Sequence, residues 1–175
     1  MKCKCTDLLT QDHKVILRCL DVLGQMSVRT EKGVDVHPDD VEAVLQFLRC
    51  FADDYHQTKE ESALFPVLLQ SAAGQSGPVS HMLFEHDQER SLVEGLEDAL
   101  RTKKGIDFVY YDNRLEALLR NHIQKEDNIL FEIVERSLST EQDEKVVSEF
   151  EKFPIKQELF VALRNLEWKY MTKSA

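Results

Sequence analysis

Two short segments of the chain share a pattern of histidine and acidic residues that suits a metal site. Residues 56–65 and residues 122–131 both read H-x-x-K-E-acid-x-x-L-F. On a helix, residues four positions apart lie about 40° apart on one face, so each copy can present an imidazole and a carboxylate to one point. A single H-x-x-x-E pattern arises often by chance on an acidic helical chain, but two copies with ten residues of shared context do not. The repeat predicts two related halves.

An acidic residue followed by histidine precedes each copy, as Asp12-His13 and as Glu85-His86. A core histidine is the ordinary interpretation of each, but the two related halves predict one histidine on each partner helix. Imidazole and carboxylate together suit a metal such as iron. Two carboxylates shared between two ions about 3.5–4 Å apart would form a dinuclear site. The predicted metal ligands are His13, His56, Glu60, His86, His122 and Glu126.

The residues beside these ligands have ordinary interpretations. Glu61 and Asp127 lie about 100° from the ligand face of a helix, so we expect them at the surface. The alternative for Glu61 is a hydrogen bond to a ligand histidine. We expect Lys59 and Lys125 to be solvated or to pair with a carboxylate three or four residues away. The Leu-Phe that closes each copy is interpreted as core packing.

Long helices must position these residues, because the chain of 175 residues holds only six glycines and four prolines. Segment 72–78 is the clearest break, and a bend is expected near Pro66. Short connections make sequential helices antiparallel neighbours. The sequence therefore predicts an all-α, up-down-up-down four-helix bundle. Apolar spacing predicts its helices over residues 6–27, 41–71, 78–102 and 106–138.

Beyond the predicted bundle domain of residues 1–138, residues 139–175 form a predicted C-terminal helical extension. Its first helix restarts at Thr140 as the N-cap, and a break follows at Phe153-Pro154. The large apolar residues after this break must be buried against the bundle or in an oligomer contact, such as a homodimer. They are Leu159, Phe160, Leu163, Leu166, Trp168 and Tyr170.

Charge and composition exclude several classes of function. A net charge of -10 argues against binding nucleic acid or an anionic membrane surface. No apolar run reaches the roughly 18 residues of a membrane span, and the N-terminus lacks a secretory signal, so we expect a cytoplasmic protein with reduced cysteines. Cys3 and Cys5 are interpreted as incidental thiols at a frayed terminus, and Cys19 and Cys50 as small core residues.

Four segments in order resemble the motifs of the bacterial hemerythrin-like, or HHE cation-binding, proteins over about residues 6–138. The third resembles the family stretch GPI-x-V-M-L-x-EH-x-x-x-R. The resemblance implies a four-helix bundle around two non-haem iron ions bridged by Glu60 and Glu126, with manganese or zinc as alternative ions. It also implies binding or sensing of a small diatomic or peroxide ligand, or repair of iron–sulfur clusters. The four segments are residues 12–16, 56–66, 77–90 and 122–131.

One departure from the family pattern bears on function. Oxygen-carrying hemerythrins have a fifth histidine one turn before the position of His86, and Met82 stands there. His81 lies about 140° from His86 on a helix, so we expect it beside the ligands or at the rim. His37 is interpreted as a surface loop histidine that a long loop could also fold inward. A centre with few histidines is more open, which favours reaction with peroxide or nitric oxide, iron oxidation or sensing over stable oxygen carriage.

Three hypotheses about function follow. The first is a diiron protein that binds dioxygen, nitric oxide or peroxide for carriage, sensing or detoxification. The second is a diiron peroxidase or oxidase or an iron-handling factor, although ferritin-like enzymes present Glu-x-x-His instead of His-x-x-x-Glu. The third is a metal-free helical interaction module with incidental histidines. No separate general base is evident, so the sequence predicts no particular turnover.

Overall fold

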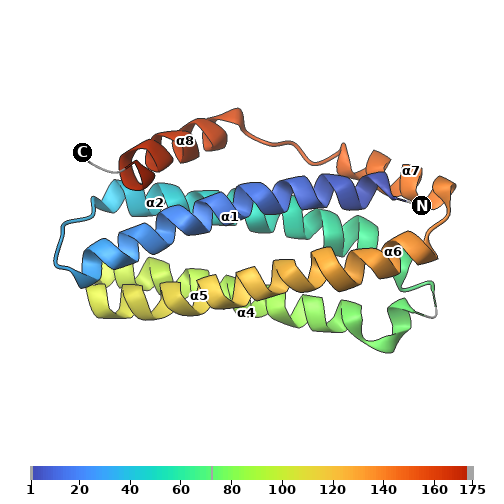
Figure 1. Ribbon diagram of the computed structural model, residues 1–175, viewed down its shortest axis with the longest axis horizontal. Coiled ribbons are helices and arrows are strands. Elements are labelled where there is room, and N and C mark those ends of the chain that lie inside the picture. The colour runs from blue at the N-terminus through green and yellow to red at the C-terminus, as the bar shows by residue number, and fades with distance from the viewer. Residues whose placement is uncertain (1, 72, 173–175) are drawn as a thin grey trace.

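The computed structural model describes residues 2–71 and 73–172, and within these every regular element is helical. Four long helical rods lie side by side and alternate in direction, which confirms the predicted four-helix bundle (Figure 1). Ala72, within the predicted break, lies outside the described residues. The first and third rods are α1 (Lys4–Glu31) and α4 (Pro78–Thr102). The second and fourth rods are composite. They comprise α2 (Pro38–Phe47), η1 (Leu48–Gln57), η2 (Glu60–Leu64) and α3 (Phe65–Leu68), then α5 (Gly105–Lys125), η4 (Glu126–Leu130) and α6 (Phe131–Ser137).

Local sequence explains where the rods begin and end. Pro38 begins α2 where its missing N–H costs nothing, and the His37 Nδ1 accepts a hydrogen bond from the Asp39 N–H at 3.3 Å. Gly77 precedes α4 with a φ of 108°, a conformation that favours glycine. Lys103 follows the last residue of α4 with a φ of 56°, a left-handed conformation that glycine adopts more readily than lysine. The nearby Gly105 does not occupy this position. Gly105 instead begins α5.

The second and fourth rods widen into π-helical turns where they carry the H-x-x-x-E segments. These turns are η1, η2 and η4. The sequence predicts a break or bend near Pro66; η2 ends at Leu64, and Pro66 lies in the first turn of α3, where proline is tolerated. Isolated π turns occur frequently at functional sites. A search for the 3.6-residue period of an α-helix does not reveal them, so this difference had no clear signal in the sequence.

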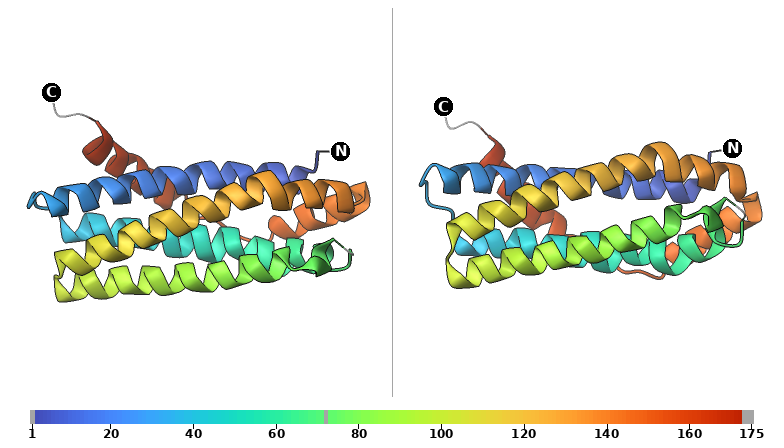
Figure 2. Two further views of the ribbon diagram at one scale, coloured as in Figure 1. Left: turned by 60° about the horizontal axis from the view of Figure 1, so that its bottom comes forward. Right: turned by 90° about the horizontal axis from the view of Figure 1, so that it is seen from below.

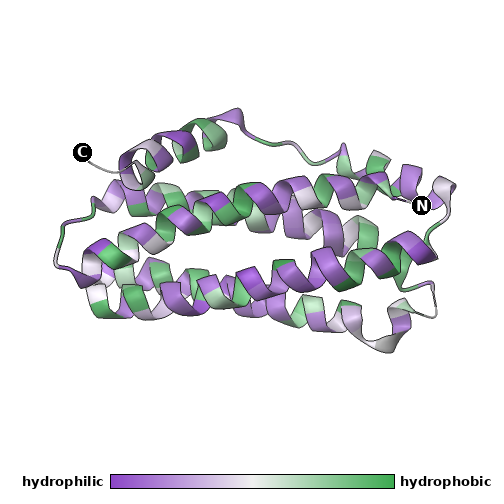
Figure 3. Cartoon of the chain, viewed as in Figure 1, coloured by the Kyte–Doolittle hydropathy of each residue, from purple (hydrophilic) through white to green (hydrophobic). Residues whose placement is uncertain are grey.

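The core consists of two apolar clusters with a polar layer between them. On α1, Leu9 belongs to one cluster, Ile16 belongs to the other, and the buried His13 lies between. The fourth rod shows the same layers in the opposite chain direction, with Ile123 and Leu130 on either side of the buried Glu126. Figure 3 shows apolar and polar residues alternating along all the long rods. The packing thus holds a polar layer inside the bundle.

The C-terminal extension contains α7 (Thr140–Phe150) and α8 (Gln157–Met171), which lie along one side of the bundle (Figure 2). The prediction of Thr140 as N-cap was wrong, because Ser139 occupies that position. Its side chain accepts a hydrogen bond from the Gln142 N–H, and the Gln142 side chain accepts one from the Ser139 N–H. This reciprocal capping box satisfies two N–H groups, which a Thr140 cap would not provide.

The segment that holds Cys3 and Cys5 is not frayed, contrary to the expectation for these two residues. Both thiols are fully buried in the apolar cluster beside α7. The Asp143 carboxylate of α7 accepts hydrogen bonds from the Lys4 and Cys5 N–H groups at 2.9 and 3.0 Å. The extension therefore caps α1 through residues nearly the whole chain length away.

The second extension helix, α8, packs on α1 and α2. Its hydroxyl at Tyr170 donates a hydrogen bond to Asp40 of α2 at 2.6 Å. Leu159, Leu163 and Leu166 are buried with it, whereas Trp168 is 76% exposed, so the bundle alone does not bury Trp168. The homodimer stays a prediction. Among the described helices, none is both long and apolar enough to cross a membrane.

Candidate metal centre

The four predicted histidines meet in two pairs inside the bundle. The Nε2 atoms of His13 and His56 lie 3.1 Å apart, and those of His86 and His122 lie 3.2 Å apart. All four side chains are at most 3% exposed. Each rod supplies one histidine, as the repeat predicted. Pairs of inward-facing imidazole nitrogens are a usual donor arrangement for a transition metal ion.

The two predicted carboxylates lie between these histidine pairs. Glu126 Oε2 is 3.2 Å from His13 Nε2 and 3.3 Å from His122 Nε2. Glu60 Oε2 is 3.6 Å from both His56 Nε2 and His86 Nε2. Each carboxylate therefore approaches both pairs. Two buried groups that could each hold a metal ion result, and they share both glutamates: His13, His56, Glu60 and Glu126, then Glu60, His86, His122 and Glu126.

The oxygens of Glu60 and Glu126 indicate that a cation fits here. Both carboxylates are fully buried, and no described residue donates a well-formed hydrogen bond to their oxygens, so within the described chain only the nearby imidazoles can offset their charge. Burying such groups without compensation is costly, and buried charges are normally paired or coordinate metals. A donor set of imidazole and carboxylate, with no thiolate in either group, satisfies the requirements of iron, manganese or zinc.

The pKa values in the layer reflect the same crowding of charge. Burial alone lowers the pKa of His13, but Asp127 and the nearby glutamates outweigh it and raise the pKa to about 10. Burial and the negative charge of Glu126 raise the pKa of Glu60 well above its usual value. Burial likewise favours a high pKa for Glu126, but the positive charge of the His122 imidazole holds the pKa of Glu126 well below its ordinary value. Protons and cations thus compete for one set of donors.

The outer nitrogens of two histidines bind the acidic residues that were expected at the surface. The His13 Nδ1 lies 2.8 Å from Asp127 Oδ1, and the His86 Nδ1 lies 2.7 Å from Glu61 Oε1. The side chains of Glu61 and Asp127 are 29% and 30% exposed at the edge of the bundle, the alternative for Glu61 is confirmed, and the contact of Asp127 with His13 was not predicted. An outer carboxylate fixes the ring orientation and directs the other nitrogen inward. Each half of the chain supplies this partner to the other half.

The remaining two histidines bind the acidic residues of the Asp-His and Glu-His pairs. The His56 Nδ1 lies 3.4 Å from Asp12 Oδ2, and the His122 Nδ1 lies 2.9 Å from Glu85 Oε2. The sequence pattern had marked both acidic residues without assigning them a role. Their shared position before a histidine was the signal.

Two lysines complete the outer layer. Lys59 forms an ion pair with Asp12, and Lys125 forms one with Glu85. The predicted solvated or same-helix interpretation was wrong, because both partners lie on other rods and Lys59 is only 2% exposed. The two ion pairs occupy matching positions in the repeat.

Two phenylalanines pack on histidines across the repeat. The ring of Phe131 stacks on His13 with centroids 5.6 Å apart, and Phe65 stacks on His86 at 6.0 Å. The Leu-Phe of each copy thus contributes core packing as predicted, and its phenylalanine also restrains a histidine of the other half. Pseudo-two-fold symmetry therefore extends from the inner donors to the outer residues.

The other residues considered from the sequence lie outside these two groups. His37 caps α2 at the surface, and the exposed His81 lies at the rim, 3.2 Å from Glu85 and from Lys125. Met82 is buried among apolar residues. Cys19 is fully buried, as expected, whereas Cys50 is only half-buried.

A four-helix bundle that holds buried clusters of histidine and glutamate defines a class of metal-binding helical proteins. Residues 5–134 match the hemerythrin HHE cation binding domain. The chain belongs to this family. Neither the curated proteins nor the solved structures contain a significant match to the chain.

Proposed function

We propose that this protein is a non-haem diiron protein that binds dioxygen or a related small ligand such as nitric oxide or peroxide. The observation that carries the proposal is the sharing of Glu60 and Glu126 between two buried histidine pairs. Shared carboxylates suit two adjacent ions of the kind found in dinuclear sites. A pair of iron ions supplies reversible changes of oxidation state and positions for an exogenous ligand.

Each histidine pair would bind one of the two ions. His13 and His56 would hold one ion, His86 and His122 the other, and both glutamates would contact each ion. The outer carboxylates keep a proton on each Nδ1, so that each Nε2 offers its lone pair inward. Two histidines per ion leave room for water or a small ligand, because iron accepts more donors than these four.

The choice of iron rests on the donor chemistry and on the family. Nitrogen and carboxylate oxygen donors suit iron, manganese and zinc, whereas thiolate would favour softer ions. Neither group of the described residues contains a cysteine. Iron is proposed because only iron among these three ions commonly combines this donor set with binding of dioxygen and nitric oxide. Carriage, sensing and detoxification all use such binding.

The experiment that tests this function is metal analysis of protein purified without oxygen and supplied with ferrous iron. We expect about two irons per chain and near-ultraviolet charge-transfer absorption after oxidation. The Glu126→Ala variant should lose at least one iron, because both groups share this carboxylate. The matched control is Glu132→Ala, which removes an exposed carboxylate from the same rod. Full iron content and an unchanged spectrum in Glu126→Ala would remove the bridging assignment.

A further inference from the structure

The repeat lets each residue around the centre be compared with its counterpart in the other half. The match covers the inner donors, the outer carboxylates, the lysines and the stacked phenylalanines. If all surrounding residues matched in this way, the two metal positions would be equivalent. Departures from the symmetry therefore identify where the two positions differ.

Two positions next to the donors break the symmetry. Gln57 follows His56, whereas Ile123 follows His122; Glu89 lies three residues after His86, whereas Ile16 lies three after His13. Both isoleucines belong to the apolar core. Gln57 and Glu89 are equally inaccessible, at 3% and 4% exposed. A buried amide in the first half and a buried carboxylate in the second half thus stand where the other half has an isoleucine.

A third departure joins the same region to the second histidine pair. Arg90 corresponds to Leu17, and its guanidinium donates a hydrogen bond at 2.7 Å to Glu61, the outer partner of His86. Glu89 Oε1 lies 3.8 Å from the outer nitrogen of His122. The outer nitrogens of both histidines therefore connect to this polar region, that of His86 through Glu61 and that of His122 by the approach of Glu89.

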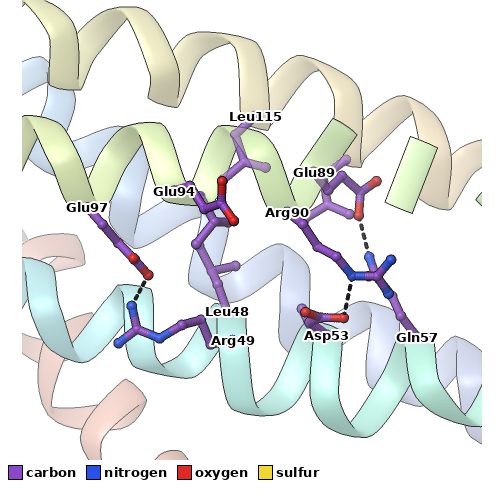
Figure 4. Close-up of a pocket in the computed structure, with 12 residues that line it drawn as sticks. Leu48, Arg49, Asp53, Gln57, Glu89, Arg90, Glu94, Glu97 and Leu115 are labelled. Atoms are coloured by element: carbon purple, nitrogen blue, oxygen red, sulfur yellow. Dashed lines mark hydrogen bonds and ion pairs between the residues drawn. The ribbon is translucent and has the colours of Figure 1, made fainter. Parts of the chain in front are cut away.

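The polar region borders a cavity of about 260 Å³ between η1, α4 and α5 (Figure 4). Gln57 and Glu89 approach each other across it from η1 and α4, joined by a hydrogen bond from the amide to the carboxylate. Arg90 lies beside them and binds Asp53. The volume accommodates several water-sized molecules. Apolar side chains, among them Leu48, Val93 and Leu115, form other parts of its wall.

Two hydrogen-bond acceptors in this region have no protein donor. Gln57 Oε1 and Glu89 Oε1 are buried, and neither accepts a hydrogen bond from any described residue. Leaving buried acceptors unsatisfied is unfavourable, so binding of a molecule that fits the cavity and donates hydrogen bonds to these acceptors is favoured. Hydrogen peroxide carries two O–H donors and is small enough. Dioxygen and nitric oxide have none.

We propose that the cavity bordered by Gln57 and Glu89 holds hydrogen peroxide beside the His86–His122 half of the centre. The proposal rests on the diiron function proposed above and makes that function selective for a ligand that donates hydrogen bonds. It also makes the surroundings of the two histidine pairs unequal, because the polar region reaches the outer nitrogens of His86 and His122.

Binding can be tested without any redox reaction, using protein loaded with zinc. Hydrogen peroxide titrated into ¹⁵N-labelled protein should shift the side-chain amide resonance of Gln57. Azide, an anion without hydrogen-bond donors near neutral pH, should leave that resonance in place. In the Glu89→Ile variant, which restores the residue type of the other half, peroxide should no longer shift it. An unmoved Gln57 amide in the wild-type protein would overturn the proposal.

Selectivity can be tested with the ferrous protein. Two ferrous ions donate two electrons to hydrogen peroxide, the O–O bond breaks, and with no further proton two hydroxide ions form. The Gln57→Ile/Glu89→Ile double variant should slow this oxidation at least tenfold while oxidation by dioxygen stays within twofold. The exposed Gln124→Leu change is the matched control and should leave both rates unaltered. The single variant Gln57→Leu gives the same test if the double variant does not fold.

The outcomes separate this inference from the function on which it rests. A wild-type protein that takes up no iron would defeat the diiron function. Variants with two irons per chain and unchanged peroxide rates would defeat the peroxide site alone. Equal slowing by both oxidants would also defeat it, because that result would reflect general damage to the centre.

Discussion

At the scale of single residues, the centre depends on which nitrogen of each imidazole faces inward. Four acidic residues decide this by accepting a hydrogen bond from each Nδ1: Asp12, Glu61, Glu85 and Asp127. A neutral imidazole has one donor nitrogen and one acceptor nitrogen. When Nδ1 donates its proton to an outer carboxylate, the lone pair is therefore on Nε2, which faces the interior of the bundle. The inner and outer residues thus act as one unit.

The outer residue Asp127 offers a test of this unit. Asp127→Asn should keep the shape of the side chain but weaken the acceptor that holds His13, and outer partners of this kind typically change metal affinity by about 10–100-fold. Iron affinity measured by competition with a chelator gives the result. The control is Asp87→Asn, an exposed residue next to His86 in sequence. Equal affinities in both variants would contradict a positioning role for Asp127.

The sequence allowed the inner cluster to be predicted, but among the outer partners it indicated only Glu61, and that as an alternative. His56 and Glu60 lie on one face of one rod, so their spacing alone places them together. The contact between Glu61 and His86 joins two rods, and the angle of Glu61 from the ligand face favoured the surface. The π-helical turns η1 and η2 alter the angular spacing that a regular α-helix would give. Long-range placement of this kind requires the packed structure.

At the scale of elements, α7 holds the N-terminal end of α1 in place. The first N–H groups of a helix have no partner within it, and Asp143 of α7 accepts two of them. The carboxylate also lies where the positive end of the helix dipole favours negative charge. The buried Cys3 and Cys5 pack beneath this contact. The predicted extension was correct as an element, but its contact with the N-terminus involves residues about 140 positions apart.

Asp143→Ala should lower the free energy of unfolding by about 1–2 kcal/mol, as loss of a helix cap does. Hydrogen bonds from Cys5 and Lys4 hold the pKa of Asp143 below its ordinary value of 3.8, although burial alone would raise it. A carboxyl with a lowered pKa stabilises the folded state above its ordinary pKa, and this contribution disappears as the pH falls through the folded value. The difference from wild type should therefore shrink below about pH 4.

Urea unfolding at pH 7 and at pH 3 measures both effects. The exposed Glu144→Ala, one residue further along α7, is the matched control and should be close to neutral at both values. A difference for Asp143→Ala that persists undiminished at pH 3 would show that the carboxylate charge is not what stabilises α1.

At the scale of the whole molecule, the centre requires all four rods at once. His13, His56, His86 and His122 come from different rods, so an unfolded chain offers no assembled site. A metal that binds only the folded state stabilises it, by about 2.7 kcal/mol when the free metal reaches 100 times its dissociation constant. The four-rod arrangement could be predicted from sequence because short connections permit few alternatives.

Calorimetry with zinc, which has no redox chemistry, tests this coupling. Zinc should raise the melting temperature of the wild-type protein by several degrees for a protein of this size. The Glu60→Ala/Glu126→Ala variant should lack most of this rise, because both groups lose their shared carboxylates. An equal rise in both proteins would indicate that zinc binds elsewhere.

Anomalous diffraction at the iron edge from crystals of the iron-loaded protein tests the two-ion arrangement most directly. The shared glutamates predict two peaks about 3.5–4 Å apart. One should lie within about 2.0–2.3 Å of the Nε2 atoms of His13 and His56, and the other at the same distance from those of His86 and His122. A single peak, or peaks outside the layer that holds Glu60 and Glu126, would contradict the diiron assignment.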